Sequence, residues 1–118
     1  MQNAERDLMP RTKTFARMVI RLFAALSRDT AAQVLGRQLL RAGTSVGANY
    51  REANRARSKA EFVAKIGECL KEADESMYWL ELLFEEGFLP RSRVEPLLEE
   101  TNELVAIFVS INKRARSA

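Results

Sequence analysis

Apolar residues recur at every third or fourth position along most of this chain, and this spacing restricts its fold more than any other feature. Residues spaced in this way share one face of an α-helix, which turns about 100° per residue. Around residues 38–58, one face of the predicted helix carries Leu35, Leu39, Ala42, Val46, Asn49 and Ala53. The opposite face carries Arg37, Arg41, Arg51 and Arg55. We therefore predict an amphipathic helix with a core face and a cationic face.

Breaks in the apolar spacing divide the chain into four segments. We predict helices over residues 12–26, 31–57, 59–86 and 93–114, with N-cap residues in the first break at Ser27–Thr30. Capping boxes at Ser58–Glu61 and Ser92–Glu95 should begin the third and fourth helices. Gly87 should end the third helix in a Schellman motif, with Phe88 packing back and Pro90 preventing continuation.

The four predicted helices are long, and their connections are short. No segment shows a convincing alternation of apolar and polar residues, so the pattern predicts an all-α fold, an antiparallel up-down four-helix bundle formed by one domain over residues 1–118. No apolar run approaches the roughly 18 residues that a membrane span needs, and the N-terminal residues lack the apolar core of a secretion signal. A single cysteine, Cys69, excludes an intramolecular disulfide framework. We expect a cytoplasmic protein without a membrane role.

Apolar surface outside the core faces predicts self-association. The fourth predicted helix is apolar over more than half of its circumference, which one neighbour cannot cover. Glycine costs a helix interior about 1 kcal/mol relative to alanine, so two mid-helix glycines favour close packing of another helix, although a bundle can also merely tolerate them. We predict an oligomer interface that contains Leu40, Gly43, Gly47, Tyr50, Tyr78, Trp79 and Leu82.

The composition argues against an enzyme. The chain has no histidine, which removes the commonest general base and transition-metal ligand together. Cys69 lies on the core face of its helix, where a structural thiol is expected rather than a nucleophile. No glycine loop of the phosphate-binding type is present. We therefore expect no catalytic residue, no cofactor and no metal site.

Polar residues border the core where the second and third helices could meet. Ser45, Asn49 and Glu52 follow the edge of the second helix, and Glu68, Glu72 and Glu75 form a strip along the third. If these helices are neighbours, Ser45, Asn49, Glu52 and Glu72 could form a hydrogen-bond network that fixes the register. A hydrolytic carboxylate pair and a solvated or intersubunit face are the alternatives.

Charge is divided unevenly between the two halves of the chain. Residues 1–59 contain 12 Lys and Arg against 4 Asp and Glu, a balance of +8, whereas residues 60–118 contain 7 against 12, a balance of −5. This polarity could serve a polyanion, self-assembly or solubility alone. Arginine, which suits bidentate phosphate contacts, predominates in the basic half. We predict that RNA or DNA is bound, by shape and phosphate rather than base readout, through Lys13, Arg17, Arg21, Arg37, Arg41, Arg51 and Arg55.

The residues QLLRAGTSVGANYREANRARS, followed by AEFVAKIGECLKEADESMYWLELL, carry a resemblance to a known family. The chain resembles the four-helix-bundle proteins encoded in intervening sequences of bacterial 23S ribosomal RNA genes, which are related to the accessory protein of diversity-generating retroelements. The resemblance is most specific at Gln38, Leu39, Ser45, Val46, Asn49, Glu52, Ala53, Ser58 and Phe62. It implies a basic bundle that assembles into a barrel-like homopentamer without catalytic residues.

Two functions follow from these observations. The first is a non-enzymatic oligomer that binds nucleic acid, with structured RNA preferred, through the arginine-rich face. The alternative is a protein-only scaffold or adaptor, in which the basic half of one copy meets the acidic half of another or of a partner protein. Nucleic-acid affinity should fall steeply with salt in the first case, whereas the oligomer itself should loosen in the second.

Overall fold

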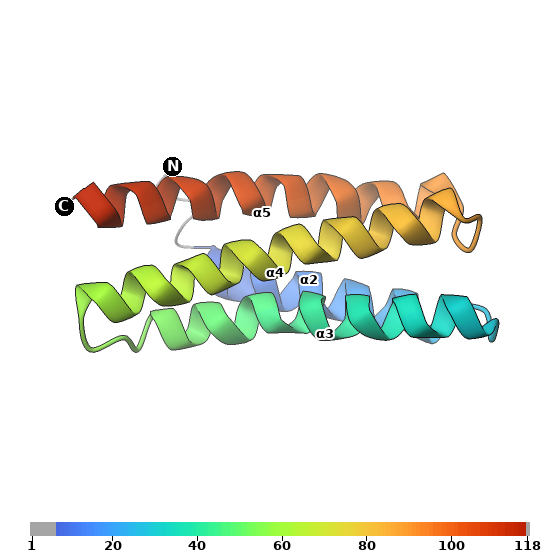
Figure 1. Cartoon of the computed structure of the whole chain (residues 1–118), viewed down its shortest axis with the longest axis horizontal. Coiled ribbons are helices and arrows are strands. Elements are labelled where there is room, and N and C mark those ends of the chain that lie inside the picture. The colour runs from blue at the N-terminus through green and yellow to red at the C-terminus, as the bar shows by residue number, and fades with distance from the viewer. Residues whose placement is uncertain (1–6, 118) are drawn as a thin grey trace.

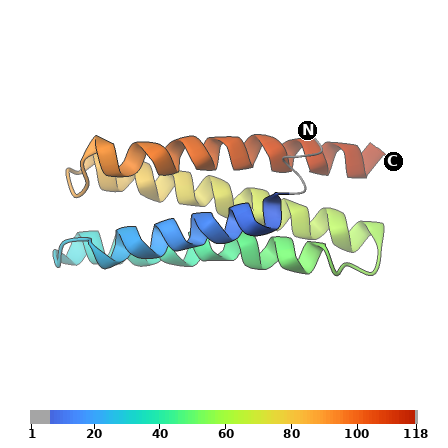
Figure 2. The ribbon, with the colours of Figure 1, turned by 180° about the vertical axis from the view of Figure 1, so that it is seen from behind.

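The computed structural model describes residues 7–117, which form a bundle of four helices (Figures 1 and 2). The helices are α2 (Leu8–Ala24), α3 (Thr30–Ala53), α4 (Lys59–Glu85) and α5 (Arg91–Ser117). Consecutive helices run antiparallel, and the molecule measures 47 × 22 × 20 Å. The α3–α4 loop and the end of α5 therefore lie at one end of the bundle, and the other two loops lie at the opposite end. The predicted all-α four-helix fold is confirmed.

The ends of α4 match the prediction most closely because local hydrogen bonds define them. At its start, Oγ of Ser58 accepts a hydrogen bond of 3.0 Å from the amide of Glu61, as a capping box requires. At its end, Gly87 has a φ of +80°, and the amide of Phe88 donates to the carbonyl of Leu83 at 2.9 Å. The amide of Gly87 also donates to the carbonyl of Phe84, which completes the predicted Schellman motif.

The boundaries of the other three helices differ from the prediction by one to four residues. Helix α2 begins at Leu8 rather than residue 12, because Pro10 falls in the first turn, where proline costs no hydrogen bond. Helix α3 ends at Ala53, with Asn54 as its C-cap, rather than at residue 57. Helix α5 begins at Arg91, and the carbonyl of Pro90 accepts the amides of residues 93 and 94. Ser92 is thus inside the first turn, and the second predicted capping box is wrong.

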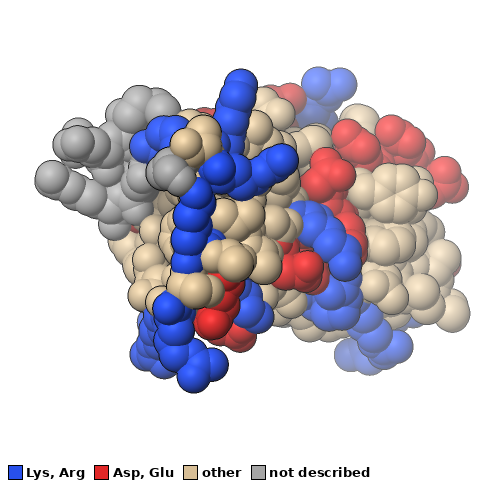
Figure 3. Space-filling model, turned by 60° about the vertical axis from the view of Figure 1, so that its left-hand side comes forward, with Lys and Arg blue, Asp and Glu red and all other residues tan. Residues whose placement is uncertain are grey.

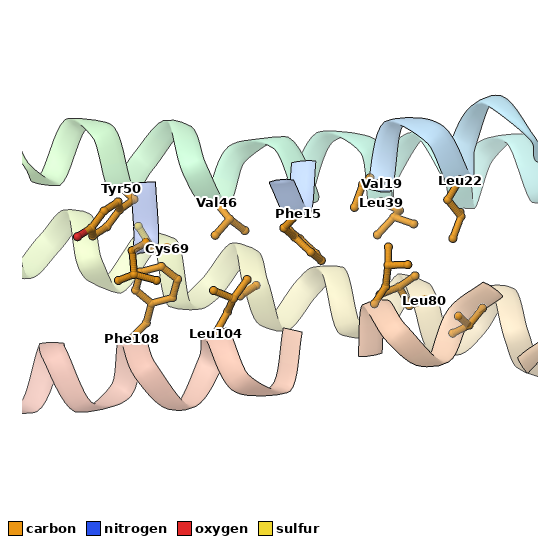
Figure 4. Packing of buried hydrophobic residues seen from close by; sticks show 14 of the residues in the cluster. Phe15, Val19, Leu22, Leu39, Val46, Tyr50, Cys69, Leu80, Leu104 and Phe108 are labelled. Atoms are coloured by element: carbon orange, nitrogen blue, oxygen red, sulfur yellow. The ribbon is translucent and has the colours of Figure 1, made fainter. Parts of the chain in front are cut away.

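The core runs along the whole bundle and receives side chains from every helix (Figure 4). Phe15, Leu39, Leu80, Leu104 and Phe108 are completely buried. Burial of one such side chain is worth about 1.5–3 kcal/mol, so these contacts dominate the stability of the fold.

Cys69 is also completely buried, as its place on the core face predicted. Burial raises the pKa of its thiol to about 12, because the thiolate would lose its solvation. Burial therefore favours the protonated thiol at neutral pH.

The mid-helix glycines of α3 permit a close approach of α2 from the same chain. A Cβ atom at Gly43 would lie 2.8 Å from Cγ2 of Val19, and one at Gly47 would lie 3.1 Å from Oγ1 of Thr12. Close helix packing was the expected reason for both glycines. The neighbouring helix is α2 of the same chain. The predicted place of these two glycines in an interface with a second copy is therefore corrected to a contact within the bundle.

Tyr50 and Leu40 also face inward rather than a second copy. Tyr50 is only 7% exposed, and its ring centroid lies 6.0 Å from that of Phe108 on α5. Leu40 is half-buried against the core. Of the predicted interface residues, Tyr78 is the one that is clearly exposed, at 54%, while Trp79 and Leu82 are half-buried beside the core. The predicted interface is therefore reduced to the surface around these three residues of α4.

Candidate nucleic-acid interface

Three of the seven predicted cationic residues line one groove between α2 and α3. Lys13 comes from α2, Arg51 from the last turn of α3, and Arg55 from the segment just after that helix. The groove has a volume of about 460 Å³, and Thr12 and Gly47 also line it. Because the helix macrodipole places partial negative charge at the end of α3, cations are favoured there even without a ligand.

The close packing at Gly47 explains how side chains of two helices reach one groove. Thr12 lies directly over Gly47, so the backbones of α2 and α3 approach each other at this point. Lys13 follows Thr12 in sequence and Arg51 is one helical turn beyond Gly47, so both lie next to this crossing. Within residues 7–117, Lys13, Arg51 and Arg55 form no ion pair.

Arg41 has a different environment from the groove residues. Its guanidinium contacts both carboxylate oxygens of Glu72 at 3.3 Å and Oε1 of Glu75 at 2.7 Å. Hydrogen bonding to Glu72, with a smaller contribution from Glu75, raises the pKa of Arg41. The structure therefore places Arg41 in an ion pair across α3 and α4, and its predicted role in the cationic face requires correction, because two carboxylates already compensate its charge.

Arg17, Arg21 and Arg37 are exposed but do not line the groove. Arg17 and Arg21 follow Lys13 along the outer face of α2, and Arg37 lies in the first half of α3. The predicted cationic face is thus divided into a groove, three outlying residues and one ion-paired arginine.

The predicted polar network also divides into separate interactions. Oγ of Ser45 donates to the carbonyl of Arg41, and Nδ2 of Asn49 donates to the carbonyl of Ser45, so both side chains bond to their own helix. Glu52 pairs with Lys65 of α4, and Glu72 pairs with Arg41. The four residues therefore do not form one network. Opposite charges on facing helices, rather than polarity alone, were the signal that would have identified the true partners.

Cationic residues that were not predicted from the sequence lie beyond the groove at the same end of the bundle. They are exposed there: Arg57 of the α3–α4 connection, Lys59 at the start of α4, and Lys113 and Arg116 of α5. Figure 3 shows Lys and Arg side chains gathered at this near end, whereas Asp and Glu side chains are more frequent farther back. Exposed Glu81, Glu85, Glu86 and Glu99 belong to the end of α4 and the first half of α5. The charge balance of the two sequence halves does not reveal this basic end. The second half is acidic overall, but the basic C-terminal part of α5 lies at the same end of the bundle as the end of α3.

Residues 7–117 contain no group of three or more Cys, Asp or Glu side chains that could hold a metal ion. Within the same residues, none of the helices is both long enough and apolar enough to cross a lipid bilayer.

Comparison with known proteins agrees with the resemblance seen in the sequence. Among solved structures, the chain is similar to a protein of unknown function from the S23 ribosomal protein family of Bacteroides thetaiotaomicron. The TM-score is 0.84 and the sequence identity 37%, over 90% of this chain and 98% of that one. No match was found among curated proteins. The family model of the 23S rRNA-intervening sequence protein matches residues 5–110. Since this match spans most of the sequence, the chain belongs to the 23S rRNA-intervening sequence protein family.

Proposed function

We propose that this protein binds structured RNA through the α2–α3 groove, without catalysing a reaction. The observation that carries the proposal is the convergence of Lys13, Arg51 and Arg55 on one open groove, where none of them has a carboxylate partner within residues 7–117. Each guanidinium can donate two parallel hydrogen bonds to one phosphate. Phosphate binding at this groove releases counterions and supplies affinity without reading sequence.

Other cations of the bundle differ from the groove cations because they form ion pairs between helices. Arg11 pairs with Glu100 and Glu103, Arg41 with Glu72 and Glu75, and Lys65 with Glu52. Each of these ion pairs joins two helices. The groove cations join none. Glu52 also lines the groove, but its carboxylate pairs with Lys65 of α4. The positive potential of the groove cations therefore extends into solvent, where it attracts polyanions.

The composition of the groove favours recognition of shape and phosphate. Its lining includes no aromatic ring, so stacking on unpaired bases has no platform there. Double-stranded RNA is recognised mainly through phosphates, 2′-hydroxyls and overall shape. RNA is preferred over DNA because the family takes its name from the 23S rRNA gene, and the structural neighbour is described as belonging to a ribosomal protein family.

Self-association is part of the same proposal. The Nε1–H of Trp79 is buried but has no hydrogen-bond acceptor within the described residues, and the exposed ring of Tyr78 packs edge-on against Trp79 at 5.1 Å. A second copy that covers Tyr78, Trp79 and Leu82 would shield this apolar surface. Five copies, the number implied by the resemblance, would give a ring with one RNA groove on each subunit.

A protein-only scaffold is the second candidate function. It is favoured by the separation of charge between the two ends of the bundle, which would let the basic end of one copy meet the acidic end of another. In that case rising salt should dissociate the oligomer, and RNA should compete with self-association instead of joining the oligomer.

The direct test replaces the groove cations in the variant K13Q/R51Q/R55Q. Its matched control, R28Q/K71Q/R93Q, removes the same charge from exposed residues outside the groove. Binding to a structured RNA should be measured for both variants and the native protein between 50 and 200 mM salt. We expect the groove variant to lose at least tenfold in affinity and about three in the slope of log affinity against log salt. Equal affinities for the groove variant and its control, with both folded, would refute the proposal.

A further inference from the structure

A second groove with cations at its rim lies between α4 and α5. It has a volume of about 640 Å³ and is lined by Leu70, Val109, Asn112, Lys113, Arg116 and Ser117. Val109 is 45% exposed, and Leu70 is half-buried, so the groove has apolar surface beside its cations. Nδ2 of Asn112 donates to the carbonyl of Val63 at 3.1 Å, which fixes α5 against α4 at this point.

The cations of this groove are presented much as those of the α2–α3 groove are. Lys113 and Arg116 are three residues apart in the last turns of α5, so both project from nearly the same side. They lie near the C-terminus of the helix, where the macrodipole favours positive charge. Within residues 7–117, neither side chain forms an ion pair.

Both grooves belong to the half of the bundle that contains the α3–α4 loop. One is formed by α2 and α3 and the other by α4 and α5, which pack on the opposite side of the molecule (Figures 1 and 2). The body between them is only about 20 Å across. Exposed Arg57 and Lys59 lie between the two sides at the end of the bundle, where Glu61 lies 4.0 Å from Arg57. Exposed Glu68 and exposed Asp7, which precedes α2, are nearby carboxylates without an ion pair in the described part of the chain.

We propose that the α4–α5 groove is a second phosphate-contacting surface, so that one structured RNA passes across the basic end of the bundle and contacts both grooves. Lys113 and Arg116 bind backbone phosphates, and the apolar surface of Val109 and Leu70 packs against the sugars between them. This inference rests on the proposed RNA-binding function and assigns it an additional site. It also explains why the basic end continues past the α2–α3 groove.

The test compares the variant K113Q/R116Q with the matched control R28Q/R93Q, which removes two exposed cations near the opposite end. Affinity for a structured RNA that forms one continuous duplex should be measured across the same salt range. We expect K113Q/R116Q to weaken binding at least fivefold and to lower the salt slope by about two, because two phosphate contacts are lost. The control should leave both quantities unchanged.

A second variant, V109E, tests the groove without removing a cation. It places a carboxylate between the rim cations at an exposed helical position, so it should weaken RNA binding as K113Q/R116Q does. Thermal unfolding of each variant should match that of the native protein. If K113Q/R116Q and V109E bind like the control while K13Q/R51Q/R55Q loses affinity, the second site is refuted and the proposed function stands. If native protein binds no RNA, or K13Q/R51Q/R55Q binds like its control, the proposed function itself fails.

Discussion

Arg41 and Arg51 occupy the same predicted stripe of α3, yet the structure gives them different environments. Arg41 meets Glu72 and Glu75 across the contact with α4, whereas Arg51 lies beside Lys13 of α2 in an open groove. Their positions on α3 are similar, because both are exposed residues outside the core face. The facing helix therefore decides whether the charge of an exposed arginine on α3 is compensated by a carboxylate.

The two contacts of α3 also differ in how closely the helices approach. Towards α2, small residues allow direct backbone packing, while towards α4, ion pairs bridge the partly exposed edge of the contact. Exposed ion pairs are worth about 0–1 kcal/mol each, whereas overpacking a close contact costs about 1–3 kcal/mol. Substitutions that overpack the contact between α2 and α3 should therefore lower the free energy of unfolding more than loss of an ion pair between α3 and α4.

The largest expected effect comes from filling the close contact with the substitution Gly43→Leu. The first added carbon would already lie 2.8 Å from Val19, so α2 must move away from α3. We expect the free energy of unfolding in urea to fall by about 2 kcal/mol or more, and RNA affinity to fall because the groove changes shape. Gly67→Ala is the control: its Cβ would meet no described atom within 4 Å, and it should stabilise the protein by about 0.5–1 kcal/mol. A native-like free energy for Gly43→Leu would contradict the close contact.

A smaller effect, on RNA affinity, should follow from removing the carboxylates of α4 that pair with Arg41 of α3. The variant E72Q/E75Q removes both carboxylates from Arg41 and leaves an uncompensated guanidinium. We expect RNA affinity to rise about threefold and the salt slope to steepen by about one, as for one additional phosphate contact. Glu81→Gln with Glu85→Gln removes the same charge near the opposite end of α4 and serves as the control. An identical rise in both variants would mean that net charge alone, and not the release of Arg41, controls binding.

Features that depend on neighbouring residues in the chain could be predicted from the sequence. Ser58 and Gly87 define the ends of α4 through hydrogen bonds within a few residues, and the apolar spacing located the buried faces, including that of Cys69. The start of α2 lies four residues before the predicted one, and Pro10 is compatible with this first helical turn.

Features that depend on the facing helix could not be predicted in the same way. The spacing of Gly43 indicated a close neighbour but could not tell α2 from a second copy of the chain. The stripe of arginines could not show that Glu72 and Glu75 would meet Arg41, since pairing depends on the relative register of α3 and α4. Lys113 and Arg116 were missed because their distance from Arg51 in the sequence hides their place at the same end of the bundle.

The most direct measurement of the central claim is the salt dependence of RNA binding for two single variants, Arg51→Gln and Arg41→Gln. Both remove one arginine charge from α3, so net charge is matched. We expect Arg51→Gln to lower the slope of log affinity against log salt by about one and to weaken binding, while Arg41→Gln should leave both close to the native values. Equal losses in the two folded variants would contradict this expectation, because the carboxylates of α4 would then have no influence on which arginines contact RNA.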